Sequence, residues 1–72
     1  MTKSELEFAI FCVENTAAVL QKDAVDVYRA WTAKSRFLYD FIIPEYETLH
    51  SQDKNYIIDI LLRAMQEWGV AV

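Results

Sequence analysis

The stretch from Arg36 to His50 limits most strongly what this chain can fold into, because it holds many of the large apolar side chains. Within it, apolar residues recur at intervals of four, four and three, which places them along one side of a helix: Leu38, Ile42, Tyr46 and Leu49. Pro44 interrupts this helix, because proline lacks the amide that would bond to the Asp40 carbonyl and its ring crowds that turn. We therefore expect a helix that starts near Arg36 and is kinked or split at Pro44, with Pro44 as the first residue of any second piece.

Two helices are expected before this stretch. Ser4 and Glu7 have the spacing of a capping box, in which each side chain accepts a hydrogen bond from the backbone amide of the other residue. This pair predicts a first helix from Glu5 to Leu20. Asp23 is a good N-cap and predicts a second helix from Ala24 to Ala33.

One further helix is expected after the stretch. Asp53 or Asn55 is positioned to cap a helix from Tyr56 to Trp68, and Gly69 is a natural stop because glycine adopts the left-handed conformation without strain. The tail 70–72 is expected to be loosely held. Together, these segments predict an all-α fold, a small four-helix bundle-like domain whose third helix is kinked or split.

Length and composition indicate a single domain over residues 1–72 that is held together by packing alone. One cysteine cannot form an internal disulfide. Together with one histidine it cannot form a structural zinc site, which needs about four ligands.

The net charge of -4 argues against nucleic acid and anionic membranes as partners, since both attract clustered Lys and Arg. The N-terminus lacks a secretory signal and no apolar run is long enough to span a membrane, so we expect a cytoplasmic protein with no cofactor or metal.

Apolar side chains are more numerous than a domain of this size easily buries. They make up 54% of the residues, against roughly 45–50% in typical soluble domains. In the first helix they form one broad face and a second, separate one: Leu6, Ala9, Ile10, Val13, Ala17 and Leu20, then Phe8, Cys12 and Val19. A helix that is apolar on two sides must be covered by other helices or by another molecule, and a homodimer is the simplest solution.

Two enzymatic hypotheses rest on single features. Glu47 and His50 are three residues apart, a spacing that recurs in di-iron bundles. One copy is not enough for a metal site, which would need a symmetric dimer with carboxylates from Glu14 or Glu45. Cys12 lies inside a helix without a neighbouring base, where a thiol is commonly buried and inert. A metal-binding or thiol-dependent enzyme is therefore an alternative function only.

A third hypothesis is a helix-turn-helix protein that binds DNA. Arg29, Lys34 and Arg36 lie around the turn between the second and third helices, where they could contact phosphates. Asp26, Asp40 and the excess of negative charge would repel those phosphates. DNA binding is therefore the second alternative.

Aromatic residues give the main functional hypothesis. No catalytic set can be assembled from the sequence, whereas the aromatic side chains are too many for all of them to lie in the core. Trp and Tyr commonly anchor protein interfaces. We therefore expect a non-enzymatic protein-protein interaction module, whose partner-binding residues come from this set: Trp31, Phe37, Tyr39, Tyr46 and Trp68.

Five short segments occur in a recognisable order. They are Glu-Leu-Glu-Phe-x-Ile-Phe-Cys-x-Glu at 5–14, Asp-Val-Tyr at 26–28, Tyr-Asp-Phe-Ile at 39–42, Tyr-Glu-Thr-Leu-His at 46–50 and Tyr-Ile-Ile at 56–58. Together they resemble a family of short bacterial proteins of unknown function over nearly the whole chain. The chain departs from that family at Pro44, which interrupts a helix that looks continuous in relatives, and at Ser51–Lys54, which replaces a turn that commonly carries glycine.

The resemblance implies an antitoxin-like or accessory role. Family members look like the small partner of a larger protein encoded beside them, in some cases one that resembles an ADP-ribosyltransferase toxin. The resemblance identifies no catalytic residue, in agreement with the analysis of the residues themselves.

Overall fold

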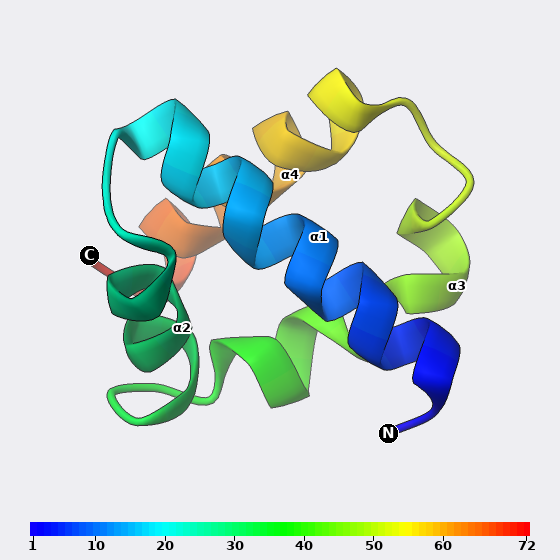
Figure 1. The fold of residues 1–72 in the computed structure, drawn as a ribbon, viewed down its shortest axis with the longest axis horizontal. Coiled ribbons are helices and arrows are strands. Elements are labelled where there is room, and N and C mark those ends of the chain that lie inside the picture. The colour runs from blue at the N-terminus through cyan, green and yellow to red at the C-terminus, as the bar shows by residue number, and fades with distance from the viewer.

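The computed structural model describes all 72 residues and contains five helices and no strand, which confirms the all-α prediction. Helix α1 (Lys3–Leu20) crosses one face of the molecule, and α4 (Lys54–Trp68) lies behind it (Figure 1). Helix α2 (Ala24–Thr32), the short helix η1 (Leu38–Ile42) and α3 (Tyr46–Leu49) complete the fold around one continuous apolar core. None of these helices combines the length and the apolar character that a membrane-spanning helix needs.

Helix α1 begins at a different capping box from the predicted one. The Thr2 hydroxyl accepts a hydrogen bond from the Glu5 amide at 3.1 Å, and the Glu5 carboxylate accepts one from the Thr2 amide at 2.8 Å. The predicted box at Ser4 and Glu7 was wrong because the same pattern occurs twice, and the earlier copy adds two residues and their hydrogen bonds to the helix. The predicted end at Leu20 is confirmed.

The buried side of α1 lies between the two predicted apolar faces. The core contains residues from both faces and one polar residue between them: Phe8, Ala9, Cys12, Val13, Thr16 and Ala17. Leu6 and Ile10, which belong to the predicted broad face, remain 50% and 48% exposed. Both α2 and α4 pack against α1, so the buried arc is centred between these two contacts and the outer edge of the broad face is left at the surface.

Ser35 joins α2 to the next segment. Its hydroxyl donates to the Ala30 carbonyl at 2.7 Å and accepts from the Phe37 amide at 3.2 Å, so one side chain bonds the end of α2 and the start of the next segment. Helix α2 ends at Thr32, one residue before the predicted end, and Asp23 occupies its N-cap position without a side-chain hydrogen bond.

Pro44 splits the third predicted helix into η1 and α3. Helix η1 is a π-helix, in which the Ile43 amide donates to the Leu38 carbonyl at 3.0 Å, five residues earlier. The expected second piece does not start at Pro44, because α3 begins two residues later at Tyr46. The proline therefore lies in a turn, where no helical carbonyl needs its missing amide.

The aromatic cluster around Phe37 connects three helices. The Phe37 ring lies 5.4 Å from the ring of Trp31 in α2, 5.2 Å from Phe41 in η1 and 5.4 Å from Trp68 in α4, measured between centroids. These spacings are within the range of favourable aromatic pairs. Both Trp31 and Phe37 are completely buried.

Helix α4 has the predicted caps but a longer N-terminal end. The Asp53 carboxylate accepts from the Asn55 amide at 3.1 Å, so the helix starts at Lys54 rather than at Tyr56. Gly69 ends it with a left-handed φ of 69°. The tail is not loosely held as expected, because the Val70 amide donates to a carbonyl of the last helical turn and the Val70 side chain packs against the core.

Replacement of Phe37 tests the aromatic cluster. We expect Phe37→Ala to lower the free energy of unfolding by about 3–5 kcal/mol, because it leaves a cavity among three ring partners. Tyr56→Ala is the control, since Tyr56 is half exposed, and should change stability by less than about 0.5 kcal/mol. Urea unfolding followed by circular dichroism measures both, and equal losses for the two variants would contradict this description of the core.

Thr16 offers a test in the opposite direction. Its hydroxyl oxygen is buried without a hydrogen-bond partner. We expect Thr16→Val to raise the free energy of unfolding by about 1 kcal/mol, because a methyl group of similar size replaces an unsatisfied polar group. Thr32→Val is the matched control, as the Thr32 hydroxyl donates to the Tyr28 carbonyl at 2.7 Å. A Thr16→Val variant that melts below the wild type would show that this hydroxyl is satisfied.

Candidate functional site

Only part of the predicted aromatic set lies at the surface. Trp31 and Phe37 are 0% exposed, so the prediction that they bind a partner is wrong: the apolar area of their rings is what holds the core together. Tyr46 is half buried and its ring meets that of Phe8 edge to face at 5.5 Å. Tyr39 is exposed and remains a candidate.

Trp68 is exposed on one side only. Its ring contacts those of Phe37 and Phe41, with centroids 5.4 and 6.2 Å apart, while 44% of the residue remains accessible. It therefore closes the end of the core. Trp68 lines none of the three pockets of the molecule.

The exposed apolar side chains gather instead at one groove between α1, α2 and η1. Nine large apolar residues are exposed, and six of them line this groove: Met1, Leu6, Ile10, Val25, Tyr28 and Tyr39. The groove has a volume of about 360 Å³ and is lined by 11 residues, of which 10 are hydrophobic. Glu14 is its single charged residue. We refer to this feature as the α1–α2–η1 groove and treat it as the candidate site.

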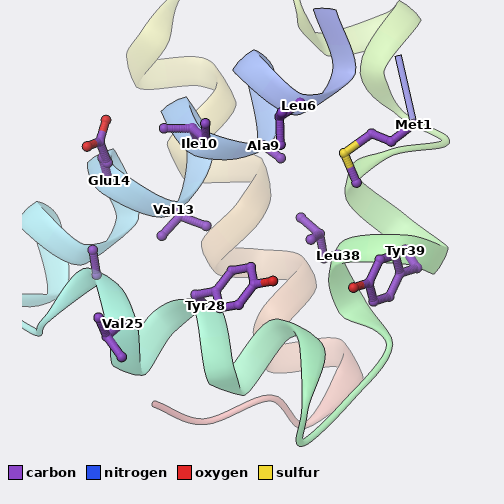
Figure 2. Close-up of a pocket in the computed structure, with 11 residues that line it drawn as sticks. Met1, Leu6, Ala9, Ile10, Val13, Glu14, Val25, Tyr28, Leu38 and Tyr39 are labelled. Atoms are coloured by element: carbon purple, nitrogen blue, oxygen red, sulfur yellow. The ribbon is translucent and has the colours of Figure 1, made fainter. Parts of the chain in front are cut away.

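The walls of the groove come from different parts of the chain (Figure 2). Leu6 and Ile10 project from α1 on one side, whereas Tyr28 from α2 and Tyr39 from η1 form the other, with their hydroxyl groups pointing toward one another. Buried side chains close the bottom: Ala9, Val13 and Leu38. Such a lining favours the binding of an apolar surface of another molecule, because covering the walls removes their apolar area from water.

Five of the six exposed apolar residues of the groove were not among the predicted site residues. They had been placed on an apolar helix face or left without a role: Met1, Leu6, Ile10, Val25 and Tyr28. The available signal was the double apolar face of α1, which indicated that some of its large side chains would stay uncovered. The sequence did not reveal which ones, because that depends on where α2 packs.

Cys12 is completely buried in the core. Burial raises the pKa of its thiol to about 12, since the thiolate would lose its hydration. The thiol is therefore protonated at neutral pH, which is the unreactive form.

His50 lies at the end of α3 and is exposed. Its ring stacks on that of Tyr46 with centroids 4.5 Å apart, and its Nδ1 donates to the Tyr46 carbonyl at 2.9 Å. No group of three or more His, Cys, Asp and Glu side chains is gathered as metal ligands, so the fold does not bring Glu14 or Glu45 to the pair formed by Glu47 and His50.

Arg36 is engaged within its own segment. Its Nε donates to the Asp40 carboxylate at 3.0 Å, and its guanidinium carbon lies 5.4 Å from the centroid of the Tyr39 ring. Through Tyr39, the Arg36 side chain borders the α1–α2–η1 groove. Its charge is paired with Asp40, whereas the helix-turn-helix hypothesis requires an arginine that is free to contact a DNA phosphate.

Comparison with known proteins gives one match. A family model described as "Protein of unknown function (DUF3791)" matches residues 7–68. No curated protein and no solved structure is significantly similar to the chain.

The state of Cys12 can be tested by alkylation. Because the thiol pKa rises from 9.0 to about 12, the thiolate fraction near pH 8 is about a thousandfold lower in the folded chain. We expect iodoacetamide to modify the native protein at least about a hundredfold more slowly than the urea-unfolded protein. The same pKa difference makes the free energy of unfolding depend on pH: the contribution of the protonated thiol is complete below pH 9 and is lost as the pH approaches 12. Rapid alkylation of the folded chain, measured by mass spectrometry, would contradict the buried position.

Proposed function

The chain belongs to the DUF3791 family of proteins of unknown function, and we propose that it is a non-enzymatic protein-interaction module that binds through the α1–α2–η1 groove. The observation that carries this proposal is the gathering of six of the nine exposed large apolar side chains at one groove. Single exposed apolar residues are common in monomers, whereas a contiguous apolar site is typical of a binding surface.

The accessible area of the chain supports the same proposal. A folded monomer of 8.4 kDa is expected to expose about 4600 Å², and the chain exposes 4650 Å². The domain is thus as compact as a typical monomer of its size. Its excess of apolar residues does not enlarge the surface but makes one part of it, the groove, apolar. Covering the groove would remove apolar area from water, at roughly 25 cal/mol per Å² before the costs of association are counted.

The chemistry of the groove favours binding over catalysis. Its only carboxylate is that of Glu14, and its other polar atoms include the hydroxyls of Tyr28 and Tyr39. A general acid or base acts beside a nucleophile or a second titratable group, and the groove contains no histidine, cysteine, serine or threonine.

The identity of a foreign partner is a separate part of the proposal. Family resemblance supports a larger protein encoded beside this one, such as an ADP-ribosyltransferase-like protein toward which the chain would be antitoxin-like. The net charge of -4 suits a basic surface on that protein and disfavours nucleic acid. We place this interaction in the cytoplasm, where a thiol such as that of Cys12 stays reduced.

Tyrosine footprinting tests whether protein covers the groove. Tyr28 and Tyr39 in the groove are 51% and 42% exposed in the isolated chain, and Tyr56 outside it is 50% exposed. We expect hydroxyl-radical labelling inside cells to modify Tyr28 and Tyr39 severalfold less than in the dilute purified chain, with Tyr56 unchanged. Equal labelling of the two groove tyrosines in both states would exclude the groove as a binding surface.

Two matched variants sharpen this experiment. Ile10→Lys places a charge in the groove, whereas Val19→Lys places one on the same helix outside it, at a residue that is 56% exposed. We expect Ile10→Lys to restore labelling of Tyr28 in cells and Val19→Lys to leave it protected. Both positions are at the surface, so neither charge has to be buried for the chain to fold.

A further inference from the structure

We propose that the occupant of the α1–α2–η1 groove is a second copy of this chain, bound so that the two α1 helices run antiparallel across a two-fold axis. This inference rests on the proposed function, because it assigns a partner to the same groove. Its basis is a self-complementary pattern of charge along the exposed edge of α1.

Four residues of α1 form this pattern. Lys3, Leu6, Ile10 and Glu14 are spaced three, four and four residues apart and lie within an arc of about 80° around the helix. All four are exposed, and the last three line the groove. The edge therefore carries a positive charge at one end, two half-exposed aliphatic side chains in the middle and a negative charge at the other end.

An antiparallel arrangement matches this pattern with itself. In a two-fold interface each contact occurs twice, so Leu6 of one copy faces Ile10 of the other and the reverse. The midpoint between these two residues is position 8, and Lys3 lies about 7.5 Å before it and Glu14 about 9 Å after it along the helix axis. Lys3 of one copy thus meets Glu14 of the other within the reach of two flexible side chains. A parallel arrangement would place like charges together.

The opposite wall of the groove completes the interface. When Leu6 and Ile10 of the second copy occupy the groove, Tyr28 and Tyr39 of the first copy lie beside them and become covered. Standard interfaces bury about 800 Å² on each partner, roughly a sixth of the 4650 Å² that this chain exposes. One face of the molecule is sufficient for such an area. Since the core closes without the exposed groove residues such as Leu6 and Ile10, the dimer forms from folded monomers.

Sedimentation velocity on charge-exchanged variants tests the arrangement. The wild type is expected to sediment at twice its 8.4 kDa mass at high concentration. Lys3→Glu and Glu14→Lys should each raise the dissociation constant of the dimer about tenfold, because each puts two like-charged pairs in the interface. The double variant should restore the wild-type value. The single changes shift the net charge in opposite directions, so a general charge effect would strengthen one dimer and weaken the other, and that result would overturn the arrangement.

A second pair of variants tests the position of the interface. Ile10→Lys should be monomeric and Val19→Lys dimeric, with the same helical circular dichroism and thermal melting for both. A wild type that stays monomeric near millimolar concentration, or an Ile10→Lys variant that stays dimeric, would overturn the inference. The proposed function would survive a monomeric wild type if Tyr28 and Tyr39 were still protected inside cells, since another protein would then occupy the groove. Loss of that protection would overturn the proposed function itself.

Discussion

The packing of Phe37 between Trp31, Phe41 and Trp68 is the interaction on which the rest of the fold depends. Helices α2, η1 and α3 have nine, five and four residues, and isolated helices shorter than about 12–15 residues are marginal in water. Their order must come from tertiary contacts. The Phe37 ring supplies such contacts to α2, to η1 and to the end of α4 at once, in a domain without a disulfide.

This cluster also determines the surface of α2. Trp31 turns toward Phe37, and Val27, four residues earlier, follows it into the core. Val25 and Tyr28 lie on the remaining sides of the same helix and stay exposed beside the uncovered edge of α1. The α1–α2–η1 groove is therefore a consequence of core packing: the orientation that buries one aromatic residue of α2 leaves another at the surface.

Residue type alone was a poor guide to the candidate site. Tryptophan and phenylalanine suit an interface and a core equally well, since both environments bury apolar area, and in this chain Trp31 and Phe37 belong to the core. Tyr39, in contrast, is exposed, next to the ion pair of Arg36 and Asp40. Aliphatic residues such as Ile10 were predicted to lie on an apolar helix face but were not named as site residues, because the spacing of a buried stripe and that of a groove wall are the same.

Local chemistry in the sequence determined where the helices lie, and packing alone determined what they bury. Asp53 caps α4, Gly69 ends it and Pro44 splits the third predicted helix, because each acts through its own backbone or its immediate neighbours. The periodicity of α1 fixes the angles between its side chains, but not the direction from which α2 and α4 approach. That direction left Leu6 exposed and buried Thr16, because the area removed from water belongs to the assembled helices and not to any one of them.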